Sequence, residues 1–293
     1  MRRFRPAPVV VLALCSALAV PAASAAAPQA QQAPQQGQKQ YEPEVGQAGK
    51  DVVWVPTSEA LVQKMLDLAK VTPDDFVIDL GSGDGRTVIA AAKRGARAHG
   101  IEYNPEMVEL SKKNATAAGV AGKATFEKAD LFETDFSKAT VITMFLLPSI
   151  NVKLRPTLLE LEPGTRIVSN TFTMEDWEAD QTATVEEGCE SWCTALLWIV
   201  PARVDGTWQL PGGRLTLTQT FQEVAGSITR DGKNAPIGNG HLRGTEFIFT
   251  VGTTKYQATV NGDTMEGTIT ASGKTQPFKA TKTSAAPKPA ARK

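Results

Sequence analysis

The sequence predicts two structured parts: an α/β domain built on a mostly parallel sheet, then a small all-β domain. Three observations favour this fold class. An apolar run, a glycine-rich turn and a helical run follow one another over residues 76–93, the layout of a nucleotide-binding crossover. Strand-like apolar runs then alternate with helical patterns to about residue 200. Beyond Pro201, apolar and polar residues alternate between hairpin turns, and no helical pattern intervenes.

The first 25 residues have the pattern of a secretion signal. Arg2, Arg3 and Arg5 precede the apolar run 9–20, which is too short to span a bilayer comfortably. Ala23-Ser24-Ala25 fits the small-x-small rule for cleavage. We therefore expect export to the periplasm or the exterior of a bacterial cell envelope, with no membrane span left after cleavage. An uncleaved membrane anchor is the alternative.

Low-complexity segments flank the two predicted domains. Residues 26–50 are rich in Gln, Ala, Pro and Gly, and residues 282–293 are mostly Ala, Pro and Lys. Such compositions cannot fill a core, so we expect a disordered linker and a disordered tail. The α/β domain is then expected at residues 51–203 and the β-rich accessory domain at residues 204–281.

Seven strands are expected in the α/β domain. They are residues 76–80, 97–102, 124–129, 139–145, 166–171, 182–185 and 195–200, and helices are expected to begin near Ser58, Thr87, Pro105 and Ile150. Residues 139–145 are almost wholly apolar, as in a central strand that is buried on both faces. Pro156 should break or restart the last of these helices.

The turn after the first strand reads Asp79-Leu80-Gly81-Ser82-Gly83-Asp84-Gly85-Arg86. A dinucleotide site needs a third glycine where Arg86 stands, and Asp84 would repel a phosphate. Carboxylates beside the turn suit a ligand that carries an amine and a sulfonium but no phosphate, which describes S-adenosylmethionine. A turn that binds NAD, or no ligand, is the alternative.

Acids also follow the next two strands. Glu102 ends the second strand, about 20 residues on, where a ribose diol is held. Asp130, with Leu131, follows the third strand, where an adenine amino group could be read. The expected cofactor-binding residues are therefore Asp79, Gly81, Ser82, Gly83, Asp84, Gly85, Glu102, Asp130 and Leu131.

With Trp54-Val55-Pro56-Thr57 and Glu102-Tyr103-Asn104-Pro105, the turn resembles the class I, Rossmann-like seven-stranded, S-adenosylmethionine-dependent methyltransferases. The likeness is closest to the branch with the lysine methyltransferases of the ATP synthase c-subunit and adenine nucleotide translocase, and covers residues 51–203. It implies that residues 54–57 lie over the cofactor as a lid, with Thr57 as a contact. Ser58 stands where this family commonly has a second proline. The alternative to a lid is that this segment leads into a helix that only covers the edge of the sheet.

The resemblance implies methyl transfer, most simply by direct displacement onto a protein lysine. Residues 145–149 end the fourth strand, where this fold places the acceptor, and they lack an Asn-Pro-Pro-Tyr-like motif. An apolar slot walled by Phe145 would lower the pKa of a lysine amine by desolvation, so no dedicated base is needed. Phe145 as an ordinary core residue is the alternative.

Two other functions remain open at this point. One is methylation of a small molecule, and the other is a non-catalytic binding protein of the cell envelope that keeps the fold. A nucleic-acid substrate is disfavoured, because removal of the leader leaves 28 basic and 31 acidic residues, a net charge of −3. The sequence gives no indication of oligomeric state.

Cys189 and Cys193 remain after the leader is removed. An oxidising compartment permits a disulfide between them, with free thiols as the alternative. No metal is expected, because His99 and His241 fall in different predicted domains. The β-rich domain shows no catalytic pattern, so it is either a docking module or a structural cap.

Overall fold

The computed structural model describes residues 41–285. The predicted leader and most of the predicted linker and tail lie outside these residues. Two boundaries differ from the prediction. Residues 41–50 contain an ordered turn, in which the Gly46 N–H donates to the Trp54 carbonyl at 2.8 Å. The last strand continues to Ala285, because Ala285 still pairs with Gly206.

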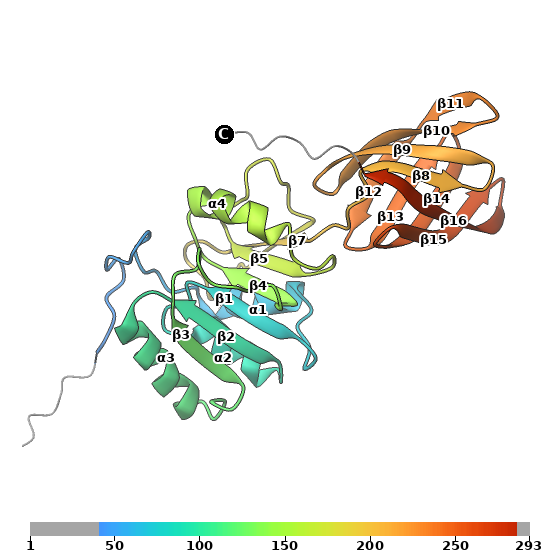
Figure 1. The fold of residues 1–293 in the computed structure, drawn as a ribbon. Helices are drawn as coiled ribbons and strands as arrows, with labels where there is room; N and C mark the ends of the chain where they lie inside the picture. Colours follow the sequence, from blue (N-terminus) through green and yellow to red (C-terminus); the bar gives the residue numbers. More distant parts are fainter. Residues whose placement is uncertain (1–40, 286–293) are drawn as a thin grey trace, which may run out of the picture. The chain divides into compact units, whose positions relative to one another are not determined.

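Seven strands form the first sheet, in the order β3-β2-β1-β4-β5-β7-β6 (Figure 1). They are β1 (Phe76–Leu80), β2 (Arg97–Glu102), β3 (Ala124–Lys128), β4 (Val141–Met144), β5 (Arg166–Asn170), β6 (Gln181–Thr184) and β7 (Thr194–Ile199). Strands β1 to β5 run parallel, while β7 is antiparallel to β5 and to β6. The chain moves outward from β1 to β3 and then returns to β4 on the other side of β1. Ligands of open α/β sheets bind at this kind of switch point.

Four helices cover the two faces of this sheet. Residues of α1 (Glu59–Leu68), α2 (Arg86–Lys93) and α3 (Pro105–Ala117) share one apolar cluster, and residues of α4 (Pro148–Leu158) belong to a second. Side chains of β1 alternate between them: Val77 belongs to the first, whereas Ile78 belongs to the second. The two faces are therefore both buried, as the apolar strands predicted.

The helix starts follow from capping residues. The Ser58 hydroxyl accepts a hydrogen bond from the Leu61 N–H, and the Asn104 side chain accepts one from the Glu106 N–H. The break predicted at Pro156 is wrong, because α4 runs through it as one helix. Pro156 cannot donate to the carbonyl of residue 152, but it lies in the last turn, so this single lost hydrogen bond falls next to the helix end at Leu158.

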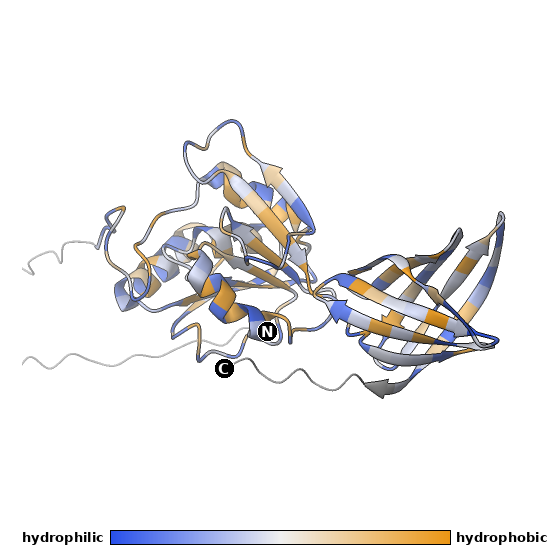
Figure 2. Ribbon diagram, turned by 90° about the horizontal axis from the view of Figure 1, so that it is seen from above, coloured by the Kyte–Doolittle hydropathy of each residue, from blue (hydrophilic) through white to orange (hydrophobic). Residues whose placement is uncertain are grey.

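The second sheet is antiparallel throughout. Its strands are β8 (Gly206–Leu210), β9 (Gly213–Thr220), β10 (Glu223–Arg230), β11 (Lys233–Pro236), β12 (Gly238–Arg243), β13 (Glu246–Val251), β14 (Thr254–Asn261), β15 (Thr264–Ala271) and β16 (Lys274–Ala285). Pairing of β8 with β16, and of β9 with β10, closes this sheet into a barrel, whereas an open barrel or a sandwich was expected. Asp231-Gly232 forms one of its hairpin turns, as predicted, whereas the turn predicted at Asn261-Gly262 lies one residue later, at Gly262-Asp263, because Asn261 still pairs with Thr264. Hydrophobic and hydrophilic positions alternate along its strands (Figure 2), and its apolar side chains form one core.

Within residues 41–285 no helix is long and apolar enough to cross a membrane.

Candidate active site

A cavity lies at the carboxyl ends of β1, β2, β3 and β4, beside the switch point of the sheet. It has a volume of about 1070 Å³ when its open mouth is included. Ten of the predicted site residues line it: Thr57, Asp79, Gly81, Ser82, Gly83, Asp84, Glu102, Asp130, Leu131 and Phe145. These residues come from five separate stretches of the chain, so the fold brings together what the sequence keeps apart.

The glycine-rich turn is held against β2. The N–H groups of Gly81 and Ser82 both donate to the Ile101 carbonyl, at 2.9 and 3.0 Å. Gly83 has a φ of +54°, and a Cβ there would lie 2.6 Å from the indole Nε1 of Trp54. Only glycine fits this position, because any side chain would be both strained and in collision with the segment that covers the turn.

Gly85, the remaining predicted contact, does not line the cavity. It is the N-cap of α2, with a φ of +82°, and a Cβ there would lie 2.8 Å from the ring of Phe126 and 2.9 Å from the side chain of Ser111. Its side-chain position therefore faces the protein core. Gly85 shapes the turn and allows α2 to begin close to Phe126 and Ser111. The spacing of the glycines could not distinguish this structural role from a ligand contact.

Asp79 is a buried carboxylate. The Thr143 hydroxyl donates to its Oδ1 at 2.6 Å. The pKa of Asp79 is raised from 3.8 to about 7, mainly by burial; the bond from Thr143 opposes this rise, and the charges of Asp84 and Glu102 add to it. A cationic ligand in the cavity would favour the ionised form, so this acid is suited to an amine or a sulfonium.

Asp84, one of the expected cofactor-binding residues, is paired with a base in the same turn. Arg86 holds it through two nitrogens, with the shortest contact at 2.6 Å from Nη2 to Oδ2. The same guanidinium donates from Nη1 to the Thr57 carbonyl at 2.8 Å. Arg86 thus ties the turn to the segment above it.

Glu102 closes the turn from the other side. Its Oε2 accepts from the Gly83 N–H at 2.9 Å, and its Oε1 accepts from the Asn104 N–H at 2.8 Å. A carboxylate oxygen has two lone pairs, so each oxygen keeps one acceptor site. This geometry fits the predicted ribose contact, because the carboxylate is fixed in place and can still accept two hydroxyl protons.

Asp130 is paired with a residue that the sequence did not identify. Lys50 Nζ donates to its Oδ2, and lies 5.1 Å from the centre of the Tyr103 ring. This hydrogen bond lowers the pKa of Asp130. Lys50 belongs to a hairpin-like turn, residues 46–54, in which Gly46 and Trp54 are hydrogen bonded. We call this segment the lid turn, since its residues 47–54 line the cavity.

The charges of the cavity fit S-adenosylmethionine better than a dinucleotide. Among the described residues, its lining includes five acids but only two bases, Lys50 and Arg86, and both are paired with carboxylates. A phosphate would therefore meet net negative charge there. Ser82 belongs to the turn and lines the cavity, and its hydroxyl is buried against Gly100 of β2 without a partner among the described residues. Residues 41–285 contain no cluster of three or more side chains suited to hold a metal.

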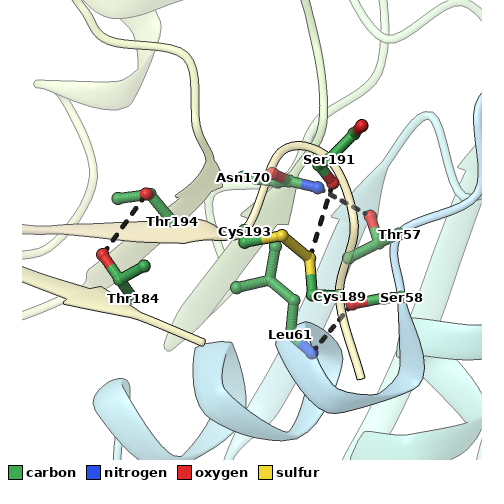
Figure 3. The surroundings of a disulfide bond; sticks show 9 residues. All are labelled: Thr57, Ser58, Leu61, Asn170, Thr184, Cys189, Ser191, Cys193 and Thr194. Carbon is green, nitrogen blue, oxygen red and sulfur yellow. Dashed lines mark hydrogen bonds between the residues drawn. A yellow bond between two sulfur atoms is a disulfide. The ribbon is translucent and has the colours of Figure 1, made fainter. Parts of the chain in front are cut away.

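A second hollow adjoins the cavity at the end of β4. It has a volume of about 1000 Å³ with its open mouth included, and it shares Phe145, Leu146 and residues 48–53 with the first. Phe145, the predicted slot wall, therefore lies between the two, and its ring stacks at 5.8 Å on Phe172. Asn170, at the end of β5, donates to the Thr57 hydroxyl at 3.2 Å (Figure 3).

Comparison with known proteins gives a consistent result. Residues 79–181 match the family model described as the ANTKMT methyltransferase domain. A protein-lysine N-methyltransferase of Saccharolobus islandicus is 46% identical over 140 residues, which cover 47% of this chain and 87% of that protein.

Two mouse proteins are also similar. The lysine N-methyltransferase of the ATP synthase c-subunit is 42% identical over 44% of this chain, and the adenine nucleotide translocase lysine N-methyltransferase is 36% identical over 47%. The matches span 52% and 60% of those proteins, so they cover only part of the mouse enzymes. A solved structure, an RNA methyltransferase from Salinibacter ruber in complex with S-adenosyl-L-homocysteine, is 48% identical over 51% of this chain and 96% of its own, with a TM-score of 0.48.

Proposed function

Because the chain belongs to the family of S-adenosylmethionine-dependent methyltransferases that includes the protein-lysine N-methyltransferase of Saccharolobus islandicus, we propose that it methylates a lysine side chain of a protein. The three lysine N-methyltransferases named above support this acceptor. The observation that carries the proposal is the character of the second hollow, which adjoins the cofactor cavity and is mostly apolar and aromatic.

The rim of the second hollow favours a protein substrate. Six large apolar side chains are exposed within residues 41–285, and three of them, Val53, Leu147 and Trp192, line this hollow. A fourth, Tyr103, lines the cofactor cavity. Exposed apolar side chains gathered at one place mark a surface that another molecule covers. A protein that carries the acceptor lysine could bury them, whereas a small substrate would leave most of them in water.

The residues of the two hollows have separate roles in this proposal. Bound S-adenosylmethionine supplies a methyl group activated by its positively charged sulfur. Asp79 offers a carboxylate to the cationic part of the cofactor, Glu102 accepts from the ribose hydroxyls, and Asp130 accepts from the adenine amino group. Phe145 lines the path of the acceptor, where removal from water lowers the pKa of a lysine amine and frees its lone pair.

We also propose that the enzyme works outside the cytoplasm. The basic and apolar pattern of residues 2–25 supports this location, and so does the disulfide that joins Cys189 to Cys193. Since S-adenosylmethionine is made in the cytoplasm, an exported enzyme would need a supply of cofactor. Fractionation of the native host, with the chain detected by antibody, tests this location.

Transfer of labelled methyl groups tests the acceptor. The purified chain is incubated with methyl-labelled S-adenosylmethionine and the protein, RNA and small-molecule fractions of a cell-envelope extract. Label recovered as methyllysine after acid hydrolysis of the protein fraction would support the proposal. Label in RNA or in a small molecule would contradict it. Cofactor binding without label in any fraction would favour the non-catalytic envelope protein.

A further inference from the structure

Three aromatic side chains gather at one end of the second hollow. Phe145 follows β4, Phe172 follows β5, and Trp192 lies in the loop between β6 and β7. The ring centres of Phe145 and Phe172 are 5.8 Å apart, and those of Phe145 and Trp192 are 6.0 Å apart. All three line the hollow, and Trp192 remains 45% exposed. We call these three residues the aromatic wall.

Two members of the aromatic wall are held by strained backbone. Trp192 itself has a φ of +54°, which is rare for a bulky side chain. Thr171, just before Phe172, has a φ of +59°, and the Phe172 N–H donates to the Asn170 carbonyl at 2.6 Å. This tight γ-turn with positive φ is an uncommon conformation. Strained backbone of this kind is concentrated at functional sites.

The disulfide restrains the loop that carries Trp192. Cys189 and Cys193 close a turn of three intervening residues, and the Val185 N–H donates to the Cys193 carbonyl at 2.9 Å. Figure 3 shows the disulfide beside Leu61 of α1 and close to Thr57. Most residues of the loop are exposed and lie outside any helix or strand. The covalent link therefore supplies order that this loop does not gain from burial.

The chemistry of the aromatic wall fits a cation on a flexible stem. Aromatic faces attract an ammonium group, and a desolvated site strengthens this attraction. The ionisable residues that line the second hollow are Lys50 and Asp51, and the Lys50 amine is shared between Asp130 and Asp51, the latter at 3.8 Å. The positive charge of the lining is thus compensated and would not repel a second ammonium. A lysine side chain would first bind with its methylenes against the apolar residues and its ammonium against the rings. The amine would then lose its proton to water before it attacks the methyl group, because only the neutral amine has a free lone pair.

We propose that Trp192, positioned by the Cys189–Cys193 disulfide, completes with Phe145 and Phe172 an aromatic pocket that binds the acceptor lysine. This inference rests on the proposed function, and it adds the residue and the covalent link that determine acceptor recognition. Trp192 contacts the acceptor, whereas the disulfide acts through Trp192 as a positioning element. Binding of the cofactor, which occupies the other cavity, should not depend on either.

Kinetics with a simple probe test the role of Trp192. The probes are the peptide acetyl-Gly-Gly-Lys-Gly-Gly-amide and poly-L-lysine, used with wild-type protein, Trp192→Ala, Trp192→Phe and Ile248→Ala. Trp192→Ala should raise KM for lysine by about 5- to 30-fold, with little change in kcat and none in the Kd of S-adenosylhomocysteine. Trp192→Phe should restore most of the loss. Ile248 is an exposed apolar residue of β13, so Ile248→Ala is the matched control and should change neither KM, kcat nor Kd.

The disulfide is tested by the double variant Cys189→Ser/Cys193→Ser. Its KM for lysine should rise, by less than in Trp192→Ala, with an unchanged Kd for S-adenosylhomocysteine. Acrylamide should quench Trp192 more strongly in this variant, measured as the fluorescence difference from the same protein with Trp192→Phe. A raised Kd for S-adenosylhomocysteine or a lowered kcat, in place of a raised KM for lysine, would contradict the positioning role.

The possible failures are distinguishable. If the wild type methylates lysine and Trp192→Ala keeps its KM, the aromatic pocket is overturned while the proposed function stands. If the wild type binds S-adenosylhomocysteine but methylates neither lysine probe, and lysine peptide gives no Trp192 fluorescence change, the proposed function fails and the aromatic pocket fails with it.

Discussion

The two sheets of this protein keep their polar groups in different places. Within residues 41–285, eleven of the twelve buried polar or charged side chains belong to the part of the chain before β8, and only Gln222 lies in the barrel. The barrel core is apolar, with Phe249 stacked on Tyr256 at 4.4 Å and 4.9 Å from Phe247. Burying a polar group costs free energy unless it is well paired. The α/β part buries polar groups in its helices and near the ends of its strands, whereas the barrel largely avoids them.

This difference separates the residues that bind the cofactor from the residues that contribute only to the stability of the fold. At the switch point the first sheet holds the ionisable Asp79 and the buried hydroxyl of Ser82, and Gly83 has a backbone only glycine tolerates easily. Changes there should alter ligand affinity more than stability. Changes inside the barrel should alter stability and leave affinity intact.

Gly83→Val should give the largest effect on binding. A side chain at this position would collide with Trp54 and occupy the turn that the cofactor approaches. We expect no measurable affinity for S-adenosylmethionine in calorimetric titration. Gly262→Ala is the matched control, because Gly262 also has a positive φ, of +56°, but its Cβ would meet nothing within 4 Å. It should lower Tm slightly and keep the wild-type Kd, and equal losses in both variants would refute the assignment of the pocket.

Phe249→Ala should give the largest effect on stability. The side chain is 2% exposed in the barrel core, and its removal should cost about 3–5 kcal/mol in the free energy of unfolding. Ile248, its neighbour on the same strand, is 47% exposed, so Ile248→Ala should change stability by about 0.5 kcal/mol or less. Urea unfolding measures both. Folded Phe249→Ala should bind S-adenosylmethionine as the wild type does, and a weaker Kd would show that the barrel contributes to the site.

Asp79→Asn should weaken cofactor binding and stabilise the free protein. The pKa of Asp79 is about 7 in the folded protein and 3.8 in the unfolded chain. Between these two pH values the folded protein keeps the proton on the Asp79 carboxyl group, whereas the unfolded chain has lost it. The Asp79 contribution therefore makes the wild type less stable as pH rises from 4 to 7, and its penalty is full above pH 7. The neutral asparagine side chain of the variant removes the penalty, so Tm at pH 8 should rise by about 3 °C or more.

Cofactor affinity should show the opposite trend. A cationic ligand binds the ionised carboxylate, so wild-type affinity for S-adenosylmethionine should fall as pH decreases below about 7, and Asp79→Asn should remove that dependence. At pH 8 the variant should bind about tenfold or more weakly. A variant that binds normally at pH 8, or a wild type without pH dependence, would show that Asp79 does not face the cation.

The elements that the sequence predicted well are those with a local signal. The apolar run 76–80 gave β1 with its observed ends, because buried parallel strands are apolar on both faces. The second strand, 97–102, also has its observed ends, although its residues are mixed and the acid Glu102 at its end was the signal. The acids after three strands lie at one cavity because parallel strands end at the same edge. The fold class follows from these same patterns.

Contacts between distant residues were not predictable in this way. Lys50 and Asp130 are 80 residues apart in the sequence, and the composition around Lys50 indicates only a linker. Gly85 has the same spacing signal as Gly83, although one faces the core and the other the lid turn. Trp192 joins Phe145 only through the fold of the loop after β6. Periodicity also could not show that β16 returns to β8 and closes the barrel.

Lys50→Gln should give the smallest change in cofactor affinity, and it tests whether the lid turn competes with the cofactor for Asp130. In the free protein Lys50 is paired with Asp130, the acid expected to accept a hydrogen bond from the adenine amino group. Cofactor binding therefore has to displace Lys50 from Asp130. Both side chains are partly exposed, and such pairs are weak and screened by salt. We expect the variant to bind S-adenosylmethionine about two- to fivefold more tightly at low salt.

Salt and a control variant distinguish this competition from a general charge effect. Raising the salt concentration should strengthen wild-type binding toward that of Lys50→Gln and should change the variant little. Lys255→Gln, at an exposed position of β14, removes the same charge and should leave the Kd unchanged. Weaker binding in Lys50→Gln would reverse the interpretation, because Lys50 would then hold the lid turn closed over the cofactor, with Asp130 as its anchor and not as the adenine contact.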